Sequence, residues 1–439
     1  MLNLRKNNLT LTKEQILDYY YTSCKNRNEF RVGLEYERVS VNSKTLKSAP
    51  YEDLRQIITH FAIIKGWGTL KDEGVTVGAT SGSTSISLEP GGQFEVSLEP
   101  KKNIAEIEKE IGEILQLIDS IGEVYDVKFL PVGITPVSTY QNIEILKKNR
   151  YLIMADYLPS LGKFAPVMMR ETAGVQVNCD YTDEADALLK LSVCAQISPF
   201  LTGFFANSPI RNNRLCNYKS FRALAWHYTD PDRCGLFYNN LINWKPMYGF
   251  EDYVDAILDV PMLFFERCNK RILVNGAITF KEFLKYGYSG YSAEFLDYKL
   301  HASLCFPDVR LKNCLEIRNH DSQNIELSMA ACAFYKGILY NENAIYETRK
   351  YLKKLSLENI NELAHKAARK GLDFSVGKEC AYKITKKLFE TAREGIGEDE
   401  RHYLDLPIAM LKDKKCVADK VLENNITGGR ELVQYLNNN

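Results

Sequence analysis

The stretch Ser85-Ile-Ser-Leu-Glu-Pro-Gly-Gly-Gln-Phe-Glu-Val-Ser97 contains two short segments in which polar and apolar residues alternate. Between them lies Pro90-Gly91-Gly92, which predicts a tight turn or bulge, because proline removes a backbone donor and glycine allows positive φ. Alternation with a period of two is typical of a strand that buries one face. The stretch therefore predicts two strands, each with one polar and one apolar face.

The same alternation recurs elsewhere in the chain. Because side chains two residues apart on a strand point to the same face, the pattern yields four polar pairs: Glu35 with Glu37, Gln93 with Glu95, Gln176 with Asn178, and Glu316 with Arg318. Glu89, just before the turn, is a further candidate for the same polar face. The opposite faces carry apolar or small residues, so we expect one antiparallel sheet with its apolar face packed on helices.

The polar face of this sheet has a composition that suits a metal. An ordinary solvated face explains any single pair, but such faces use Thr, Lys and Ser freely, whereas these positions favour carboxylates and amides. Carboxylates gathered without lysines repel each other unless a hard cation neutralises them. The pattern predicts Mg²⁺, with Mn²⁺ as an alternative, on oxygen ligands from Glu35, Glu37, Glu89, Glu95, Asn178 and Glu316.

The rest of the chain predicts an α+β fold. Helices are expected from a capping box at Thr12 and over 51–65, 104–125 and 183–206, and strands over 30–41, 128–134 and 171–180, with a further alternating segment over 308–319. Beyond Ser322 the chain is expected to be almost wholly helical. We therefore predict an α+β core over residues 1–325 and a helical region over 326–439 packed on it, as one structural unit.

Composition excludes several classes of protein. The 439 residues carry 56 Lys+Arg and 56 Asp+Glu, so the basic excess of a broad nucleic-acid surface is missing. Aromatic residues make up 11%, which is too rich for a disordered chain. The twenty uncharged residues of 191–210 include several polar ones, and they favour a buried helix over a membrane span. Eleven scattered cysteines without a CxxC pair, and an N-terminus without an apolar targeting segment, predict a reducing, cytoplasmic location.

Two further segments hold residue types that bind ligands. Residues 78–83 are rich in glycine but precede a strand, so a hairpin loop is expected and not a phosphate cradle. The run Arg222-Ala-Leu-Ala-Trp226-His-Tyr-Thr-Asp-Pro-Asp-Arg233 is expected to be a loop in which an arginine grips a substrate carboxylate beside a tryptophan wall. A surface loop anchored by its tryptophan is an equal alternative.

Together these segments resemble the plant-type glutamate–cysteine ligase (γ-glutamylcysteine synthetase) family. The resemblance rests on Gly33-Leu-Glu-Tyr-Glu37, on residues 85–95, on Val175-Gln-Val-Asn178, on Phe205-Ala-Asn-Ser-Pro209, on 222–226, on Phe306-Pro-Asp-Val-Arg-Leu-Lys312 and on Leu315-Glu-Ile-Arg318. It runs from about Leu11 to beyond Ala331. It implies a glutamine-synthetase-like fold, a curved antiparallel sheet shaped as a funnel and covered by helices.

The resemblance also implies an activity. ATP would phosphorylate the γ-carboxylate of L-glutamate, and the amine of L-cysteine would attack the resulting γ-glutamyl phosphate, as in the first step of glutathione synthesis. Such a reaction needs no covalent nucleophile on the enzyme. The residues assigned to it are Arg318 and Glu316 for catalysis, Arg222, Trp226, Arg233 and Gln93 for substrate, and Arg310, Lys312 and Arg318 for the nucleotide.

Some matches and alternatives stay open. Glu171 stands where family members often have arginine, and Ala173 where plant members have a regulatory cysteine, so neither role is carried over. A ligase of the same fold with another amine acceptor is the nearest alternative, followed by a guanidino kinase and a silent metabolite-binding protein. We expect no nucleic-acid or membrane partner, and a monomer or homodimer.

Overall fold

The computed structural model describes residues 11–72, 74–235, 249–268, 270–355, 357 and 359–438. Its centre is a nine-stranded sheet in which every pairing is antiparallel, with the order β14-β15-β7-β1-β5-β4-β3-β2 and β6 paired to β1. The strands are β1 (Val32–Asn42), β2 (Gly68–Asp72), β3 (Val75–Ser81), β4 (Thr84–Leu88), β5 (Phe94–Ser97), β6 (Val127–Leu130), β7 (Gly174–Cys179), β14 (Val309–Leu311) and β15 (Leu315–Asp321). The predicted antiparallel sheet of an α+β fold is confirmed.

Helices from both halves of the chain cover the apolar face of this sheet. They include α2 (Tyr51–Lys65) on β3, α3 (Ile104–Val124) on β6, α6 (Glu184–Phe204) on β15, and α12 (Ile325–Leu339) on β7 and β1. One hydrophobic cluster joins strand residues such as Leu34 and Val177 to Phe334 and Phe389 of the C-terminal helices. The predicted boundary between the α+β core and the helical C-terminal region, at residues 325/326, stays a prediction.

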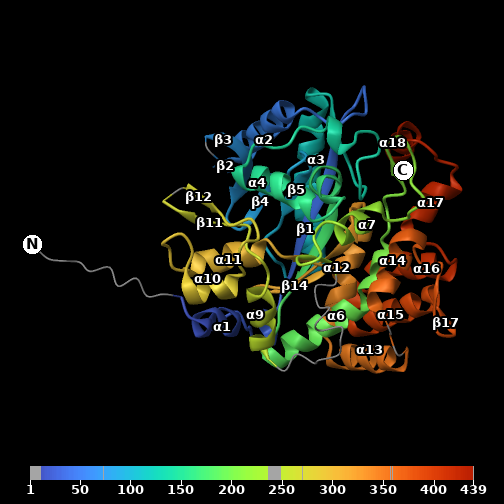
Figure 1. The fold of residues 1–439 in the computed structure, drawn as a ribbon. Coiled ribbons are helices and arrows are strands. Elements are labelled where there is room, and N and C mark those ends of the chain that lie inside the picture. The colour runs from blue at the N-terminus through green and yellow to red at the C-terminus, as the bar shows by residue number, and fades with distance from the viewer. Residues whose placement is uncertain are drawn as a thin grey trace, which may run out of the picture.

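The remaining helices flank the sheet. In Figure 1, α14, α15 and α16 lie to one side of strand β1, and α9, α10 and α11 lie to the other. Their bounds, with those of the other helices, are α1 (Lys13–Tyr21), α4 (Asn149–Tyr157), α5 (Ala165–Glu171), α7 (Phe221–His227), α9 (Phe250–Leu258), α10 (Phe280–Tyr286), α11 (Phe295–Ser303), α13 (Glu342–Leu355), α14 (Ile360–Lys370), α15 (Ala381–Gly395), α16 (Asp405–Lys412), α17 (Val417–Glu423) and α18 (Gly429–Asn438). Short two-stranded pairings complete the fold: β8 (Ile210–Arg211) with β9 (Arg214–Leu215), β10 (Cys234–Gly235) with β13 (Phe306–Pro307), β11 (Phe264–Arg267) with β12 (Lys270–Leu273), and β16 (Ser375–Val376) with β17 (Glu379–Cys380).

Several local predictions are confirmed. Thr12 and Gln15 form the expected capping box of α1. Glu89 N donates to Gln93 O and Gly92 has φ +79°, so the Pro-Gly-Gly segment is a tight turn. Residues 78–83 form the end of the hairpin between β3 and β4, where Ser81 pairs with Thr84. Helix α6 has the length and apolarity of a membrane span, yet 78% of its most apolar stretch is buried inside the protein, as in a core helix.

Other local predictions are wrong. Residues 221–227 form helix α7 and not a loop, because the Ser220 side chain accepts from Ala223 N and caps a run of good helix formers. The strand expected to begin at Glu171 begins at Gly174, and Glu171 ends helix α5. The alternating segment 308–319 is two strands with a turn between them, and β16 and β17 interrupt the helical C-terminal region. Residues 1–10, part of the N-terminus in which we found no targeting segment, lie outside the described residues.

Acid should destabilise this fold through a buried histidine. His301 on α11 is 2% exposed, and its Nε2 lies 2.9 Å from the carbonyl of Ile257. Burial lowers the pKa of His301 to about 4. As the pH falls below about 6.5, this imidazole therefore takes up a proton in the unfolded chain but stays neutral in the folded chain until about pH 4. We expect the free energy of unfolding to fall by about 2–3 kcal/mol between pH 7 and pH 4.5 from this residue alone. Urea unfolding at both pH values should show a smaller fall for His301→Gln, and an equal fall would contradict the assignment.

Candidate active site

Four neighbouring strands gather carboxylates on the polar face of the sheet. Glu37 on β1 lies opposite Glu95 on β5, and Glu35 lies opposite Gln176 on β7. Asn178 on β7 in turn lies opposite Glu316 on β15. Directly opposed side chains have Cβ atoms about 5 Å apart. Three of the four predicted polar pairs are thus brought together, and we call this surface the carboxylate face: Glu35, Glu37, Glu89, Glu95, Gln176, Asn178, Glu316 and Arg318.

Neutral donors hold most of the carboxylates of this face in place. Asn178 Nδ2 donates to Glu35 Oε1 at 2.9 Å, and Gln176 Nε2 donates to Glu37 Oε1 at 3.3 Å. Glu37 Oε2 also accepts from Gly174 N at 2.6 Å. Further donors are the hydroxyl of Ser97, at 2.6 Å from Glu95, and that of Tyr151, at 3.2 Å from Glu89. These hydrogen bonds orient the carboxylates without neutralising them.

Electrostatics at this face favour a cation. Burial raises the pKa of Glu37 to about 7, and the charge of Glu89 adds to the effect. Burial also raises the pKa of Glu95 well above its ordinary range, with Glu89, Glu35 and Glu37 contributing. Over the described part of the chain, no three His, Cys, Asp or Glu side chains are grouped so as to hold a metal by themselves. A metal here would take further ligands from water or a phosphate, as Mg²⁺ commonly does.

The β15 end of the face is cationic. Burial opposes ionisation of Glu316, but Arg310, Arg318 and Lys312 together hold its pKa well below the ordinary range. Arg310 Nε lies 2.7 Å and Arg318 Nη1 3.2 Å from Glu316 Oε2, while Lys312 pairs with Oε1. Both oxygens of Glu316 are therefore engaged by cations, which suits an anchor for these side chains better than a metal ligand.

A bulge in β15 aims Arg318. The pairing with β7 shifts between Ile317 and His320, so one extra residue of β15 stands in this interval. Such bulges redirect side chains and are frequent beside active sites. Arg318 Nη1 donates to Gln176 Oε1 on the carboxylate face, and the guanidinium lies 5.7 Å from the ring centre of Trp226. Arg318 therefore joins the carboxylate face to helix α7.

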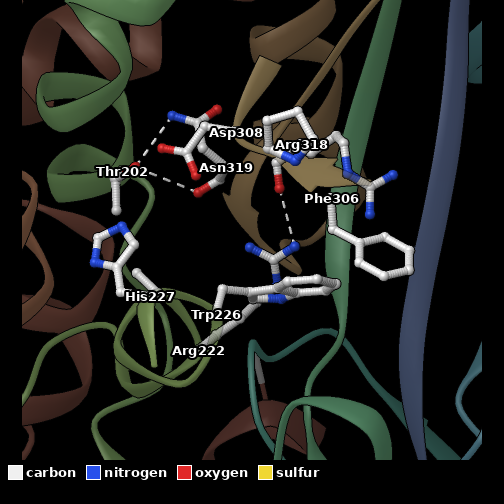
Figure 2. A pocket seen from close by; sticks show the side chains of 10 residues that line it. Thr202, Arg222, Trp226, His227, Phe306, Asp308, Arg318 and Asn319 are labelled. Carbon is white, nitrogen blue, oxygen red and sulfur yellow. Dashed lines mark hydrogen bonds between the residues drawn. The ribbon is translucent and has the colours of Figure 1, made fainter. Parts of the chain in front are cut away.

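A narrow pocket lies where α7 meets β15. Its lining includes Arg222, Trp226, Phe306 and Arg318, and Figure 2 shows the Trp226 ring between Arg222 and Phe306. Arg222 is 4% exposed, and its Nη2 donates to Arg318 O at 2.9 Å, the dashed line beneath Arg318 in the same view. Neither Arg222 Nε nor Trp226 Nε1 finds an acceptor among the described residues, although both are buried. Two unsatisfied donors in one pocket suit an anionic ligand.

The structure does not support three of the predicted ligand contacts. Gln93 is 3% exposed, and its amide bonds Met169 O, Thr172 O and Gly91 N, so it clamps the turn. Arg233 is 1% exposed and pairs with Asp230 and the carbonyl of Pro261. Arg310 is bound by Glu316 and by the carbonyl of Cys305 at 2.6 Å. Contacts within the protein occupy the polar groups of each side chain. The prediction that these three residues bind substrate or nucleotide is therefore not supported.

Sequence reasoning missed other residues at the site. Tyr151, which donates to Glu89, comes from helix α4 and carries no motif. Gly174 packs directly against the Arg222 guanidinium, and a Cβ at this position would lie 2.5 Å from Arg222 Nη2. A lone glycine at the start of a strand was the one available signal. Glu171 pairs with Arg211 and accepts a hydrogen bond from Tyr140 N, so its role is structural. This agrees with the decision not to assign it a substrate contact.

One cysteine touches the carboxylate face: Cys314 Sγ donates to Asn178 Oδ1 at 3.4 Å, and burial raises its pKa, which disfavours a reactive thiolate. All eleven are free, and Cys179 at the end of β7 is 0% exposed on the apolar face, where burial raises its pKa well above the ordinary range. We expect Cys179→Ala to cost about 1–2 kcal/mol of unfolding free energy and to leave turnover per folded molecule unchanged. Denaturant unfolding together with an activity assay checks this, and a well-folded but inactive variant would contradict it.

The chain is similar to known proteins along most of its length. The model of the family "Glutamate-cysteine ligase family 2" matches residues 31–433. A chloroplastic glutamate–cysteine ligase of Medicago truncatula is 31% identical over 419 residues, which cover 94% of this chain and 82% of that protein. That of Arabidopsis thaliana is 30% identical over 419 residues, covering 94% and 80%. A solved structure of a Francisella tularensis glutamate–cysteine ligase in complex with AMP shares the fold, with a TM-score of 0.55, 13% identity and coverage of 90% and 84%.

These comparisons overturn one expectation. The cytoplasmic location was inferred from free cysteines and from the lack of a targeting segment. The plant relatives, including that of Nicotiana tabacum, are all chloroplastic, so the prediction is contradicted. Free cysteines indicate a reducing environment, which more than one compartment provides.

Proposed function

The chain belongs to glutamate–cysteine ligase family 2, and from that membership we propose how its carboxylate face and the pocket at α7 act together in catalysis. The resemblance seen in the sequence is confirmed, and the enzyme is a glutamate–cysteine ligase that uses ATP to join the γ-carboxylate of L-glutamate to the amine of L-cysteine. The observation that carries the proposal is a set of half-buried carboxylates on neighbouring strands, with Glu37 directly opposite Glu95, where burial and mutual repulsion raise the pKa of both.

The carboxylate face is proposed to hold Mg²⁺, or Mn²⁺ in its place. Carboxylate oxygens would come from among Glu35, Glu37, Glu89 and Glu95, with Asn178 as a neutral neighbour. Because no three of the described carboxylates are grouped to hold a metal alone, ATP phosphates and water would complete the ligand shell. When bound, the metal offsets phosphate charge and favours transfer of the γ-phosphoryl group. Glu316, which was among the expected metal ligands, is proposed instead to anchor Arg318 and Lys312, because both of its oxygens are paired with cations.

Arg318 is proposed to stabilise the transferring phosphoryl group. It extends from the bulge of β15, and Gln176 and Glu316 hold one of its nitrogens beside the carboxylate face. A guanidinium fixed in this way presents its charge without reorganisation during the reaction. Lys312, whose side chain is 32% exposed and lies 3.8 Å from Glu35, is the second cation in reach of a nucleotide phosphate.

Helix α7 is proposed to select glutamate. Arg222 would bind the α-carboxylate through its unsatisfied Nε, and Trp226 would wall the pocket. This leaves the γ-carboxylate directed toward the phosphate, where an acyl phosphate forms and the cysteine amine then attacks. Excluding water with the tryptophan ring would protect that acyl phosphate from hydrolysis.

A product assay tests the reaction and the acceptor. The enzyme is incubated with ATP, Mg²⁺, glutamate and one of cysteine, serine, alanine or glycine, and products are identified by mass spectrometry. We expect γ-glutamylcysteine with one ADP and one phosphate for each peptide bond, and much less product from the other amines. Product from another amine but not from cysteine would refute the acceptor, and full activity in EDTA would refute the metal.

A further inference from the structure

A buried carboxyl group at the end of β15 lies behind the glutamate pocket. Asp321 is 1% exposed, and three donors surround it. Its Oδ2 accepts from Asn207 N at 2.7 Å and from the Ser208 hydroxyl at 2.6 Å, and its Oδ1 accepts from the Ser220 hydroxyl at 2.8 Å. The scheme of catalysis above assigns this group no role.

The two serines connect Asp321 to the first turn of α7. Ser220 Oγ accepts from Ala223 N at 3.0 Å, and Ser208 Oγ accepts from Arg222 N at 3.1 Å. Each hydroxyl thus donates to the carboxylate and accepts from a backbone N–H of the helix. Because a carboxylate accepts only, it fixes the direction of both hydroxyl groups, and both are then oriented to accept from α7.

The side chain of Arg222 reaches back to the same strand. Its Nη2 donates to the carbonyl of Arg318, three residues before Asp321 on β15, and its guanidinium rests on Gly174 of β7. Asp321 and Arg222 also attract each other electrostatically. One short segment of β15 therefore fixes the position of both the backbone and the guanidinium of Arg222. The same segment also carries Arg318.

We propose that Asp321 is a positioning residue for glutamate binding: through Ser208 and Ser220 it fixes the start of α7 against β15, and so sets where the Arg222 guanidinium meets the substrate. The inference rests on the proposed role of Arg222. In Asp321→Asn one acceptor becomes an NH₂ group. Since the Oδ2 position faces two donors, the amide oxygen stays there, and Ser220 loses its acceptor and its fixed orientation.

Steady-state kinetics of Asp321→Asn test the proposal. We expect the KM for glutamate to rise about tenfold or more, because small misplacements of a binding group have large effects, while the KM for ATP stays within about threefold. Glutamate KM in the double variant Asp321→Asn/Arg222→Lys should be close to that of Arg222→Lys alone, because both changes impair the same contact. A purely structural role would lower stability and leave the ratio of the two KM values unchanged, which would overturn the proposal, as would additive effects in the double variant.

A matched variant controls for the loss of a buried carboxylate. Asp297 on α11 is 3% exposed and accepts from Arg267 and from Glu294 N, away from the proposed substrate contacts. Asp297→Asn should lower the thermal midpoint without changing either KM, and a glutamate-specific effect there would overturn the proposal. If Asp321→Asn does not fold, Ser220→Ala removes the same hydrogen bond to Asp321 together with the cap on Ala223 N, with the same expected split in KM and the same contradicting result.

The outcomes separate the two claims. Arg222→Lys with an unchanged glutamate KM would remove Arg222 from the site and this inference with it. A raised glutamate KM in Arg222→Lys, combined with an unchanged value in Asp321→Asn, would overturn the positioning role alone and leave the proposed function intact.

Discussion

Glu95→Gln should lower turnover by roughly 10²- to 10³-fold, the loss expected when a metal that supplies several kcal/mol of transition-state stabilisation is poorly held. The free energy of unfolding should not fall in this variant. Burial and the charges of Glu89, Glu35 and Glu37 raise the pKa of Glu95 well above its ordinary range, so a neutral amide relieves repulsion. The amide oxygen can still accept from the Ser97 hydroxyl, which bonds Glu95 at 2.6 Å. Turnover at saturating substrates and urea unfolding without metal measure the two effects.

Glu99→Gln is the matched control for this experiment. Its side chain is 58% exposed, two residues beyond the end of β5, and it pairs only loosely with Lys101 at 3.5 Å. We expect Glu99→Gln to keep full activity. Mg²⁺ with a non-hydrolysable ATP analogue should raise the thermal midpoint of the native enzyme and of Glu99→Gln, but much less that of Glu95→Gln. Full activity of Glu95→Gln would disprove the metal assignment.

The carboxylate face was predictable because strands have a strict period. Glu35 and Glu37, or Gln176 and Asn178, share a face whatever the neighbouring strands do, and one apolar face suffices to determine which side of each strand is buried. The structure adds the exact registers, which bring Glu37 beside Glu95 and Asn178 beside Glu316, because a slip of two residues would bury the same face. Local pattern was enough to predict the face because the information is carried within each strand.

The failures share a different physical cause. Gln93, Arg233 and Arg310 are residue types that bind ligands. Besides the carboxylates that pair with the two arginines, their partners are backbone carbonyls, including those of Met169, Pro261 and Cys305. Backbone carbonyls exist at every residue, so no sequence pattern marks which of them a long side chain will meet. Satisfying a buried guanidinium or amide is a demand of tertiary packing. The cluster around Asp321 was also not predictable, because its donors come from two segments distant in sequence, Asn207 with Ser208 and Ser220.

The β-bulge in β15 could not be predicted from the sequence for a related reason. Alternation predicts that Glu316 and Arg318 share a face, but it does not reveal the shift in pairing between Ile317 and His320. A bulge depends on how two strands are paired and not on one strand alone. Its consequence is functional, because Arg318 then offers its carbonyl to Arg222 and its guanidinium to Gln176.

Arg222→Lys should raise the KM for glutamate by about 30- to 150-fold and leave that for ATP nearly unchanged. Arg222 has separate nitrogens for two tasks: Nη2 is held by the carbonyl of Arg318 at 2.9 Å, while the buried Nε has no acceptor within the described structure. A lysine ammonium is a single point that cannot serve both, and it lacks the planar group that rests on Gly174. Losing a charge-assisted contact to the substrate carboxylate costs about 2–3 kcal/mol, which gives the stated range. Arg267→Lys, which breaks the buried pair with Asp297, controls for the loss of a bidentate arginine and should change stability but neither KM. An unchanged glutamate KM in Arg222→Lys would show that the guanidinium merely joins α7 to β15, and the α-carboxylate would then need another partner.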